Sequence, residues 1–167
     1  IPIQHHHAHV LSVIAEKGLE DVIGVSCDGA GYGPDGSTWG GEVLHCTGET
    51  FRRVGHLQPQ PLLGGDLAAR YPIRMAAGIL GDTPETRDWL HEYKELFPHG
   101  EQEFRLILNQ LKSGRSSMTT SCGRVLDAVS AVLGLCMERT YEGEPAMKLE
   151  SAALKGSDVL GLVPQIS

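Results

Sequence analysis

The chain has 167 residues, 41% of them hydrophobic, which is enough to bury one hydrophobic core. Its formal net charge of −7 and aromatic content of 5% argue against a broad surface for nucleic acid or anionic membranes and against a base-stacking platform. No apolar run approaches the roughly 20 residues that span a bilayer, and the first residues do not resemble a secretory signal. We therefore expect no nucleic-acid partner and no membrane association.

The four cysteines are widely spaced and form no Cys-x-x-Cys pair: Cys27, Cys46, Cys122 and Cys136. This spacing argues against a disulfide framework or a structural zinc site, and it indicates free thiols in a reducing, cytoplasmic setting. Cys27 falls within an apolar run, so we expect a buried structural thiol there. Neither Cys27 nor Cys122 is expected to be a nucleophile.

The first 60 residues are predicted to form a helix and three strands. The helix runs from Gln4 to Lys17 and ends at a glycine. A buried strand is expected over Asp21–Cys27, followed by a glycine-rich turn over Gly29–Gly36. Two more strands, Trp39–Cys46 and Phe51–Leu57, are joined by a tight turn. Such closely connected strands predict an antiparallel meander.

Residues 61–167 have a helical pattern throughout. The expected helices are Asp66–Leu80 (interrupted near Pro72), Pro84–Phe97, Glu101–Leu111, Ser121–Leu135 and Glu144–Lys155. Strands followed by a helical block predict a mixed fold of the α/β class. Within these 167 residues the segregation of strands and helices corresponds to an α+β arrangement.

A cluster of histidines opens the first helix. His5 and His9 lie four residues apart, so on a helix both imidazoles face one side and can reach a single metal ion. His6 and His7 would point elsewhere, as supports for the ligands or as contacts to a substrate. The alternative is an expression tag, but a tag would be uninterrupted and would not run into an amphipathic helix.

Asp28 ends the first predicted strand, where side chains are commonly presented to ligands. Its carboxylate would complete a His-His-Asp metal site with positions open for substrate oxygens; the alternative is an ordinary turn-capping aspartate. The glycines that follow would let backbone amides approach phosphate oxygens; they are Gly29, Gly31, Gly33 and Gly36.

A third motif lies in the helix predicted over Ser121–Leu135. An apolar stripe at helical spacing is formed by Val125, Val129 and Val132 or Leu133. Arg124 and Asp127 lie away from that stripe, either as a surface ion pair or as ligand contacts. In the second case Asp127 would hold ribose hydroxyls and Arg124 would meet a phosphate or carboxylate. The turn Tyr141–Pro145 would lie nearby if the last two helices are antiparallel.

Four ordered motifs resemble those of the HypF family of hydrogenase-maturation carbamoyltransferases. They are Gln4-His5-His6-His7-Ala8-His9; Asp28-Gly29-x-Gly31-Tyr32-Gly33-x-Asp35-Gly36-x-x-Trp39-Gly40-Gly41-Glu42; Pro61-Leu62-Leu63-Gly64-Gly65-Asp66 with Arg74-Met75-Ala76; and Gly123-Arg124-x-x-Asp127-Ala128-Val129 with Tyr141-Glu142-Gly143-Glu144. The motifs cover nearly the whole chain.

This resemblance implies the C-terminal carbamoyltransferase domain of that family, which is similar to tRNA threonylcarbamoyltransferases and has an actin/sugar-kinase-like (ASKHA) fold. It implies carbamoyl transfer from carbamoyl adenylate, made from carbamoyl phosphate and ATP, to the C-terminal cysteine of the partner HypE. The product is the source of cyanide ligands for nickel–iron hydrogenase.

The resemblance also suggests roles for individual residues. We expect iron or zinc on His5, His9 and Asp28, with Mg²⁺ as a further candidate cation. Catalytic roles are expected for Asp28, His6 and His7, and nucleotide contacts for Gly29, Gly31, Gly33, Arg124, Asp127, Gly143 and Glu144.

The chain departs from the family in extent. The acylphosphatase-like part, the zinc modules, the adenylate-forming domain and the last glycine-rich loop with its N-D-G motif are missing. Residues 1–167 are therefore interpreted as an internal part of the domain and predicted to be inactive alone.

Two alternatives stay open from sequence. A tRNA threonylcarbamoyltransferase would carry a serine-glycine-glycine-histidine loop, which the Asp28–Gly36 motif replaces here. A metal-binding interaction module that has lost its cleft would be the non-enzymatic alternative.

Overall fold

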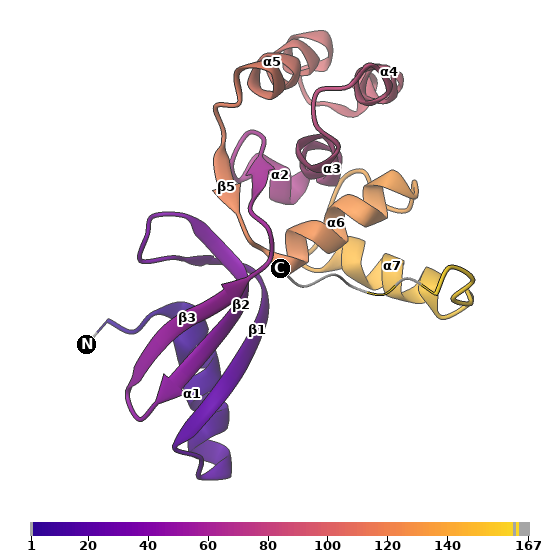
Figure 1. Cartoon of the computed structure of the whole chain (residues 1–167). Coiled ribbons are helices and arrows are strands. Elements are labelled where there is room, and N and C mark those ends of the chain that lie inside the picture. The colour runs from indigo at the N-terminus through magenta and orange to yellow at the C-terminus, as the bar shows by residue number, and fades with distance from the viewer. Residues whose placement is uncertain (1, 162, 164–167) are drawn as a thin grey trace.

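The computed structural model describes residues 2–161 and 163. The elements in chain order are α1 (His5–Lys17), β1 (Asp21–Tyr32), β2 (Thr38–Thr47), β3 (Thr50–His56), β4 (Gln60–Leu62), α2 (Leu67–Arg70), α3 (Pro72–Leu80), α4 (Pro84–Glu92), the 3₁₀ turn η1 (Lys94–Leu96), α5 (Gly100–Ser113), β5 (Ser117–Thr119), α6 (Cys122–Val132) and α7 (Glu144–Ala153). Figure 1 shows two parts, with α1 beside β1–β3 in one and helices α2–α7 in the other.

Helix α1 has a defined start, end and packing face. The Gln4 side chain accepts a hydrogen bond from the His7 amide at the N-terminus, and Gly18 ends the helix with a φ of 63°, a conformation that glycine adopts without strain. Val10 and Ile14 are buried against the sheet. A Cβ at Gly24 would fall 2.5 Å from Val10, so glycine at that position lets α1 approach β1 closely.

The expected antiparallel meander is confirmed, since β2 pairs antiparallel with β1 and with β3. The glycine-rich segment, however, is not a turn throughout. Strand β1 continues to Tyr32, with an irregularity between Cys27 and Gly31, because the β2 ladder offers partners to these residues. Only residues 33–37 form the turn.

The prediction of helices alone after residue 60 is wrong. Strands β4 and β5 pair antiparallel, and β5 joins β2 in parallel at Thr38 and Thr119, which gives one five-stranded sheet. Three-residue strands separated by more than 50 residues leave no periodic pattern to detect. Through them the helical part is tied to the sheet (Figure 1).

The helices otherwise follow the expected order. The chain breaks between α2 and α3 at Pro72, as predicted. The main helical core joins α3, α4 and α5 through residues such as Ile73, Leu90 and Ile107. Among the described residues, no helix is both long and apolar enough to cross a membrane.

Helix α6 does not bury its apolar stripe. Its buried face carries Arg124, Asp127, Ala128, Ser130 and Ala131, while the predicted apolar stripe is largely exposed, with Val129 at 41% and Val132 at 49%. The two alanines pack against Met75 and Ala76 of α3. Small side chains permit this close helix contact, and the burial also encloses the ion pair.

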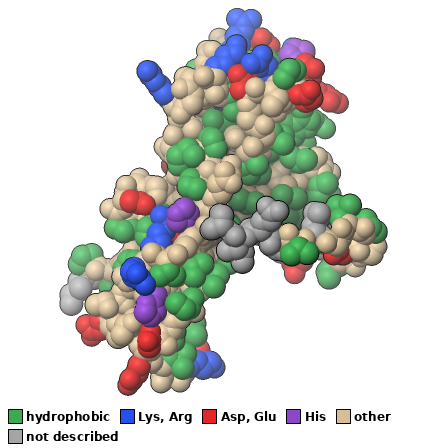
Figure 2. Space-filling view, in the orientation of Figure 1, with side chains coloured by type: hydrophobic (Ala, Val, Ile, Leu, Met, Phe, Trp, Pro, Cys, Tyr) green, Lys and Arg blue, Asp and Glu red, His purple; other side chains and the backbone are tan. Residues whose placement is uncertain are grey.

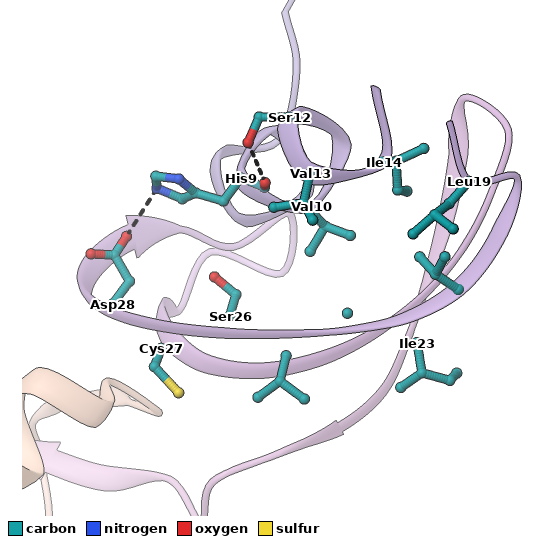
Figure 3. A pocket seen from close by; sticks show the side chains of 13 residues that line it. His9, Val10, Ser12, Val13, Ile14, Leu19, Ile23, Ser26, Cys27 and Asp28 are labelled. Carbon is teal, nitrogen blue, oxygen red and sulfur yellow. Dashed lines mark hydrogen bonds and ion pairs between the residues drawn. The ribbon is translucent and has the colours of Figure 1, made fainter. Parts of the chain in front are cut away.

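Cys27 is exposed, so the prediction of a buried thiol is wrong. Strand β1 is covered by α1 on one face only, and Cys27 lies on the other face with Ile23 and Val25, which are 61% and 68% exposed. Figure 3 shows Ser26 and Cys27 on opposite sides of the strand. An apolar run alone does not tell which faces of a strand are covered.

Candidate functional site

His5, His9 and Asp28 converge where the start of α1 lies beside the irregularity in β1 between Cys27 and Gly31. Each offers one ligand atom, and these atoms lie within 4.8 Å of one another. The His9 Nε2 atom lies 3.2 Å from His5 Nε2 and 3.7 Å from Asp28 Oδ2, while His5 Nε2 lies 2.6 Å from the same oxygen. Ligands of a tetrahedral ion at about 2.1 Å would lie about 3.4 Å apart. The cluster therefore fits a small divalent cation after a slight widening of the His5–Asp28 contact.

The cluster is partly open to solvent. The side chains of His5 and His9 are 47% and 59% exposed, and that of Asp28 is 28% exposed. Burial raises the pKa of Asp28, but hydrogen bonds from the Gly29 amide and from His5 outweigh it and leave the pKa below its usual value. An ionised aspartate with two accessible imidazoles suits a site that takes a metal and a substrate together.

His6 is fully buried beside this cluster, and its tautomer follows from the Gln4 amide. The Gln4 Oε1 atom accepts from the His7 backbone amide at 2.7 Å, so the Gln4 Nε2 group must be the one 2.9 Å from His6 Nδ1. Because Nε2 of Gln4 can only donate, Nδ1 of His6 accepts and its proton is on Nε2. That N–H lies 3.8 Å from Asp28 Oδ2 and has no hydrogen-bond partner among the described residues.

His7 is also buried but faces away from the cluster, with its ring 4.6 Å from that of Phe51. Burial lowers the pKa of His7, and burial together with the neighbouring His5 lowers that of His6, so both favour the neutral form. The structure thus brings His6 to the site and leaves His7 under the sheet.

The predicted glycines are placed by different contacts. A Cβ at Gly31 would fall 2.5 Å from His6, and one at Gly33 would fall 2.2 Å from Trp39. These two glycines make room for side chains of the protein itself. Gly29 lines the cavity beside the cluster, and its amide donates to Asp28 Oδ1 at 2.6 Å.

Arg124 and Asp127 form a buried pair with an Nη1–Oδ2 distance of 2.8 Å. They are not the surface pair that spacing allowed, since Arg124 is 8% and Asp127 2% exposed. Burial lowers the pKa of Arg124 and raises that of Asp127. The Arg124 guanidinium lies against Gly29, which connects α6 with the cluster of His5, His9 and Asp28.

A cavity of about 330 Å³ lies between the cluster and α6. It is lined at one end by His5, Asp28 and Gly29, and at the other by Arg124, Arg139 and Glu142. The segment between α6 and α7 therefore reaches the site. This is the placement expected for the turn Tyr141–Pro145 if the last two helices are antiparallel. A larger cavity of about 590 Å³ runs between α1 and β1, and Figure 3 shows it lined mainly by aliphatic side chains, with His9 and Asp28 at one end.

Gly143 and Glu144 do not line the 330 Å³ cavity. Gly143 has a φ of 79° and precedes α7, for which it serves as N-cap. Glu144 accepts hydrogen bonds from the Thr140 amide and hydroxyl, and it contacts Lys148 at 2.8 Å. Hydrogen bonds from Lys148 and Thr140 lower the pKa of Glu144 to about 2. In this structure its carboxylate braces the loop before α7.

Sequence reasoning missed a network that fixes the turn beyond β1. Arg53 stacks on Trp39 at 4.1 Å, donates to Glu42 at 2.6 Å and reaches Asp35 at 3.3 Å. Glu42 is fully buried and also accepts from the Thr120 hydroxyl and the Gly40 amide. Four of these residues, Asp35, Trp39, Gly40 and Glu42, belong to the glycine-rich motif, but Arg53 and Thr120 are too distant in sequence to be linked by spacing.

Comparison with known proteins agrees with the fold and the motifs. A family model described as the second subdomain of the Kae1-like domain of carbamoyltransferases matches residues 24–166. The domain is therefore of the Kae1-like carbamoyltransferase class. The chain is 45% identical to a probable carbamoyltransferase HypF of Methanocaldococcus jannaschii over 168 residues, which is 98% of this chain and 22% of that protein.

Two crystal structures share the fold. HypF from T. kodakarensis superposes with a TM-score of 0.83 at 46% identity, covering 93% of this chain and 22% of that one. A full-length HypF in a phosphate- and nucleotide-bound form gives a TM-score of 0.78 at 39% identity, covering 90% and 20%. The chain belongs to the HypF carbamoyltransferase family, and it spans about a fifth of the length of these relatives.

Proposed function

We propose that this chain forms part of an ASKHA-type cytoplasmic enzyme that transfers a carbamoyl group from carbamoyl adenylate to the C-terminal cysteine of HypE, for cyanide-ligand synthesis in nickel–iron hydrogenase maturation. The observation that carries this proposal is the convergence of His5, His9 and Asp28 at one end of a cavity whose other end holds Arg124. A metal site beside a buried cation suits a substrate with a carbonyl and a phosphate.

The chemistry of the donor set supports a divalent ion, with iron or zinc as the candidates. When bound by His5, His9 and Asp28, such an ion would act as a Lewis acid toward the carbamoyl carbonyl. The His6 Nε2–H is a buried, fixed donor beside this position, so it can stabilise charge that develops on a substrate oxygen.

The residues around the cavity position the other half of the substrate. Arg124 is available to the phosphate, and Asp127 holds its guanidinium in place. The partner's thiolate would attack the carbamoyl carbon, the bond from that carbon to the phosphate oxygen would break, and AMP would leave with the bonding pair. Because the nucleophile comes from the partner, the chain needs none of its own.

The test uses the protein made from the complete reading frame that contains this chain. It is incubated with ATP, carbamoyl phosphate and purified HypE, and the intact mass of HypE is recorded. We expect a carbamoyl increment that depends on the divalent metal and is lost in His9→Ala. The matched control is His56→Ala, because His56 is exposed on β3 and its side chain hydrogen-bonds the carbonyl of the neighbouring Leu57.

Retention of the increment in His9→Ala would contradict the assignment of the metal site. Absence of any increment on HypE would contradict the acceptor, and tRNA would then be tested as an alternative. We also propose that the 167-residue chain alone transfers no carbamoyl group, which the same mass measurement checks.

A further inference from the structure

Two cysteines from distant parts of the sequence meet where α6 begins beside β1. Cys27 is exposed on the face of β1 opposite α1 (Figure 3), and Cys122 is the first residue of α6 and half-buried. Neither cysteine lines the 330 Å³ cavity. The pair is therefore separate from the groups to which the proposed function assigns roles.

The backbones that carry the two thiols are in direct contact. The Ser121 hydroxyl, at the N-cap of α6, donates to the Asp28 carbonyl at 3.1 Å and also to the Gly29 carbonyl. A Cβ at Gly123 would fall 2.9 Å from the Gly29 Cα. The residues on both sides of one cysteine thus touch the two residues that follow the other. A disulfide requires such a close approach, since it joins residues whose Cα atoms are about 4.4–6.8 Å apart.

The two thiols also interact with each other, and they differ in accessibility. Burial raises the pKa of the Cys122 thiol, and the charge and hydrogen bonding of the neighbouring Cys27 thiol raise it further. Cys27 is the exposed member of the pair, so a dissolved reagent meets it first. Cys122 is shielded but adjacent, and a reaction between neighbouring groups needs no encounter through solution.

The other two cysteines are placed differently. Cys46 is fully buried in the core between α1 and the sheet, and Cys136 is buried with its thiol on the Glu138 carbonyl. All four thiols are free in this structure. The wide spacing in the sequence argued against a disulfide framework, but spacing cannot show that two distant thiols are in contact. Exposure and proximity single out Cys27 and Cys122.

We propose that Cys27 and Cys122 form a reversible disulfide by exchange with an oxidised small thiol such as glutathione disulfide. The Cys27 sulfur attacks one glutathione sulfur, the S–S bond of the glutathione disulfide breaks, and the departing glutathione takes the Cys27 proton. The Cys122 sulfur then displaces the second glutathione from Cys27, and that glutathione takes the Cys122 proton. Two cysteine thiols are oxidised and one glutathione disulfide is reduced to two thiols. The bond fastens β1, which carries Asp28, to α6, which carries Arg124.

The experiment follows the thiols of the full-length protein in glutathione buffers with an increasing oxidised fraction. Free thiols are blocked after an acid quench, and tryptic peptides are analysed by mass spectrometry. Trypsin places Cys27 in peptide 18–52 and Cys122 in peptide 116–124, and fragment spectra distinguish Cys27 from Cys46. Hydrogen exchange in reducing buffer verifies that each variant keeps the fold of β1 and α6.

We expect peptides 18–52 and 116–124 to become linked in the oxidising buffers and to separate again on addition of dithiothreitol. In Cys122→Ser, Cys27 should instead carry glutathione at a level at least about tenfold above that in the unmodified protein, because no neighbouring thiol displaces it. Cys27→Ser should form no link and leave Cys122 reduced. Cys136→Ser is the matched control, since it removes a buried thiol outside the pair, and it should keep the link.

The linked protein should also show slower hydrogen exchange at the start of α6 than the reduced protein, a difference that Cys122→Ser should lack. Equal exchange in the linked and reduced forms would contradict the fastening of α6 to β1.

Absence of the linked peptides at every glutathione ratio would overturn the proposal. Equal glutathione on Cys27 in the unmodified protein and in Cys122→Ser would do the same, as would a link from Cys27 to any other cysteine. None of these measurements involves carbamoyl transfer, so this inference and the proposed function fail separately.

Discussion

Gly31 lies against two histidine rings. A Cβ there would fall 2.5 Å from His6 Cε1 and 2.7 Å from His5 Cδ2, and His6 is fully buried, so it cannot withdraw. We expect Gly31→Ala to displace His5 and weaken Zn²⁺ binding by at least about tenfold, measured by equilibrium dialysis. Gly55→Ala is the matched control, since its Cβ would meet only Val43, at 3.5 Å. Unchanged affinity in Gly31→Ala would contradict the placement of these rings.

Glu42 should make the stability of the fold depend on pH. Burial would raise the pKa of Glu42, but hydrogen bonds from Thr120, Arg53 and the Gly40 amide outweigh it and hold the pKa below 4.5. A depressed pKa in the folded state adds stability above the unfolded pKa, and this stability is lost as the pH falls through the folded value.

We therefore expect Glu42→Gln to lower the free energy of unfolding at pH 7 by about 2 kcal/mol. The variant should also lose less stability than the unmodified chain between pH 6 and pH 3. Urea unfolding of both proteins at several pH values measures this. Glu49→Gln, in the exposed β2–β3 turn, is the control and should follow the unmodified chain.

At the level of single residues, the helical spacing of His5 and His9 was enough to predict a shared face. The role of His6 was not predictable, because its tautomer depends on the Gln4 amide and on burial against β1. Asp28 was predicted at a strand end, but it lies within β1, at the irregularity between Cys27 and Gly31. Arg139 was missed because nothing in the local sequence indicates that its loop folds back toward β1.

Helix α6 shows what hydrophobic pattern alone cannot decide. Its valines form an apolar stripe at helical spacing, but the alanines make the contact with α3: Ala131 is fully buried there, and Val132 is 49% exposed. We expect Ala131→Leu to destabilise the chain by about 1–3 kcal/mol, because the added atoms have no space. Val132→Leu should change stability by less than about 0.5 kcal/mol. Thermal unfolding of the pair tests the orientation, and similar effects at both positions would contradict it.

For the strands, the turn residues predicted β2 and β3 with boundaries close to those observed, whereas β1 runs beyond its predicted end at Cys27 as far as Tyr32. Strands β4 and β5 could not be predicted, since each is three residues long and gains its hydrogen bonds only from a distant partner. These two strands tie the helical part to the sheet. Because they could not be predicted, the sequence did not show how the two parts are joined.

The whole molecule exposes apolar surface on its sheet. In the described chain β1 pairs on one edge only, with β2, and Ile23 and Val25 project from its uncovered face. Figure 2 shows hydrophobic side chains reaching the surface on several parts of the face in view, including the part formed by the sheet. Exposed strand edges with apolar side chains favour association.

We therefore expect the 167-residue chain to self-associate at micromolar concentration, and Val25→Lys to reduce that association. Sedimentation velocity at several concentrations measures the change. Ser12→Lys adds the same charge at an exposed position of α1 and should have little effect. A purely monomeric chain, or equal effects from both variants, would contradict this interpretation of β1.

The sequence by itself determined the family motifs, the order of the main elements and the residues that can reach one metal ion. These features depend on local spacing, because helix and strand periodicity places neighbours in the chain on known faces. Only the tertiary structure decided which face of α6 is buried, that Cys27 is exposed, and that Arg139 shares a cavity with His5 and Asp28. Those outcomes depend on which surfaces meet, and burial is a property of the partner surface as much as of the residue.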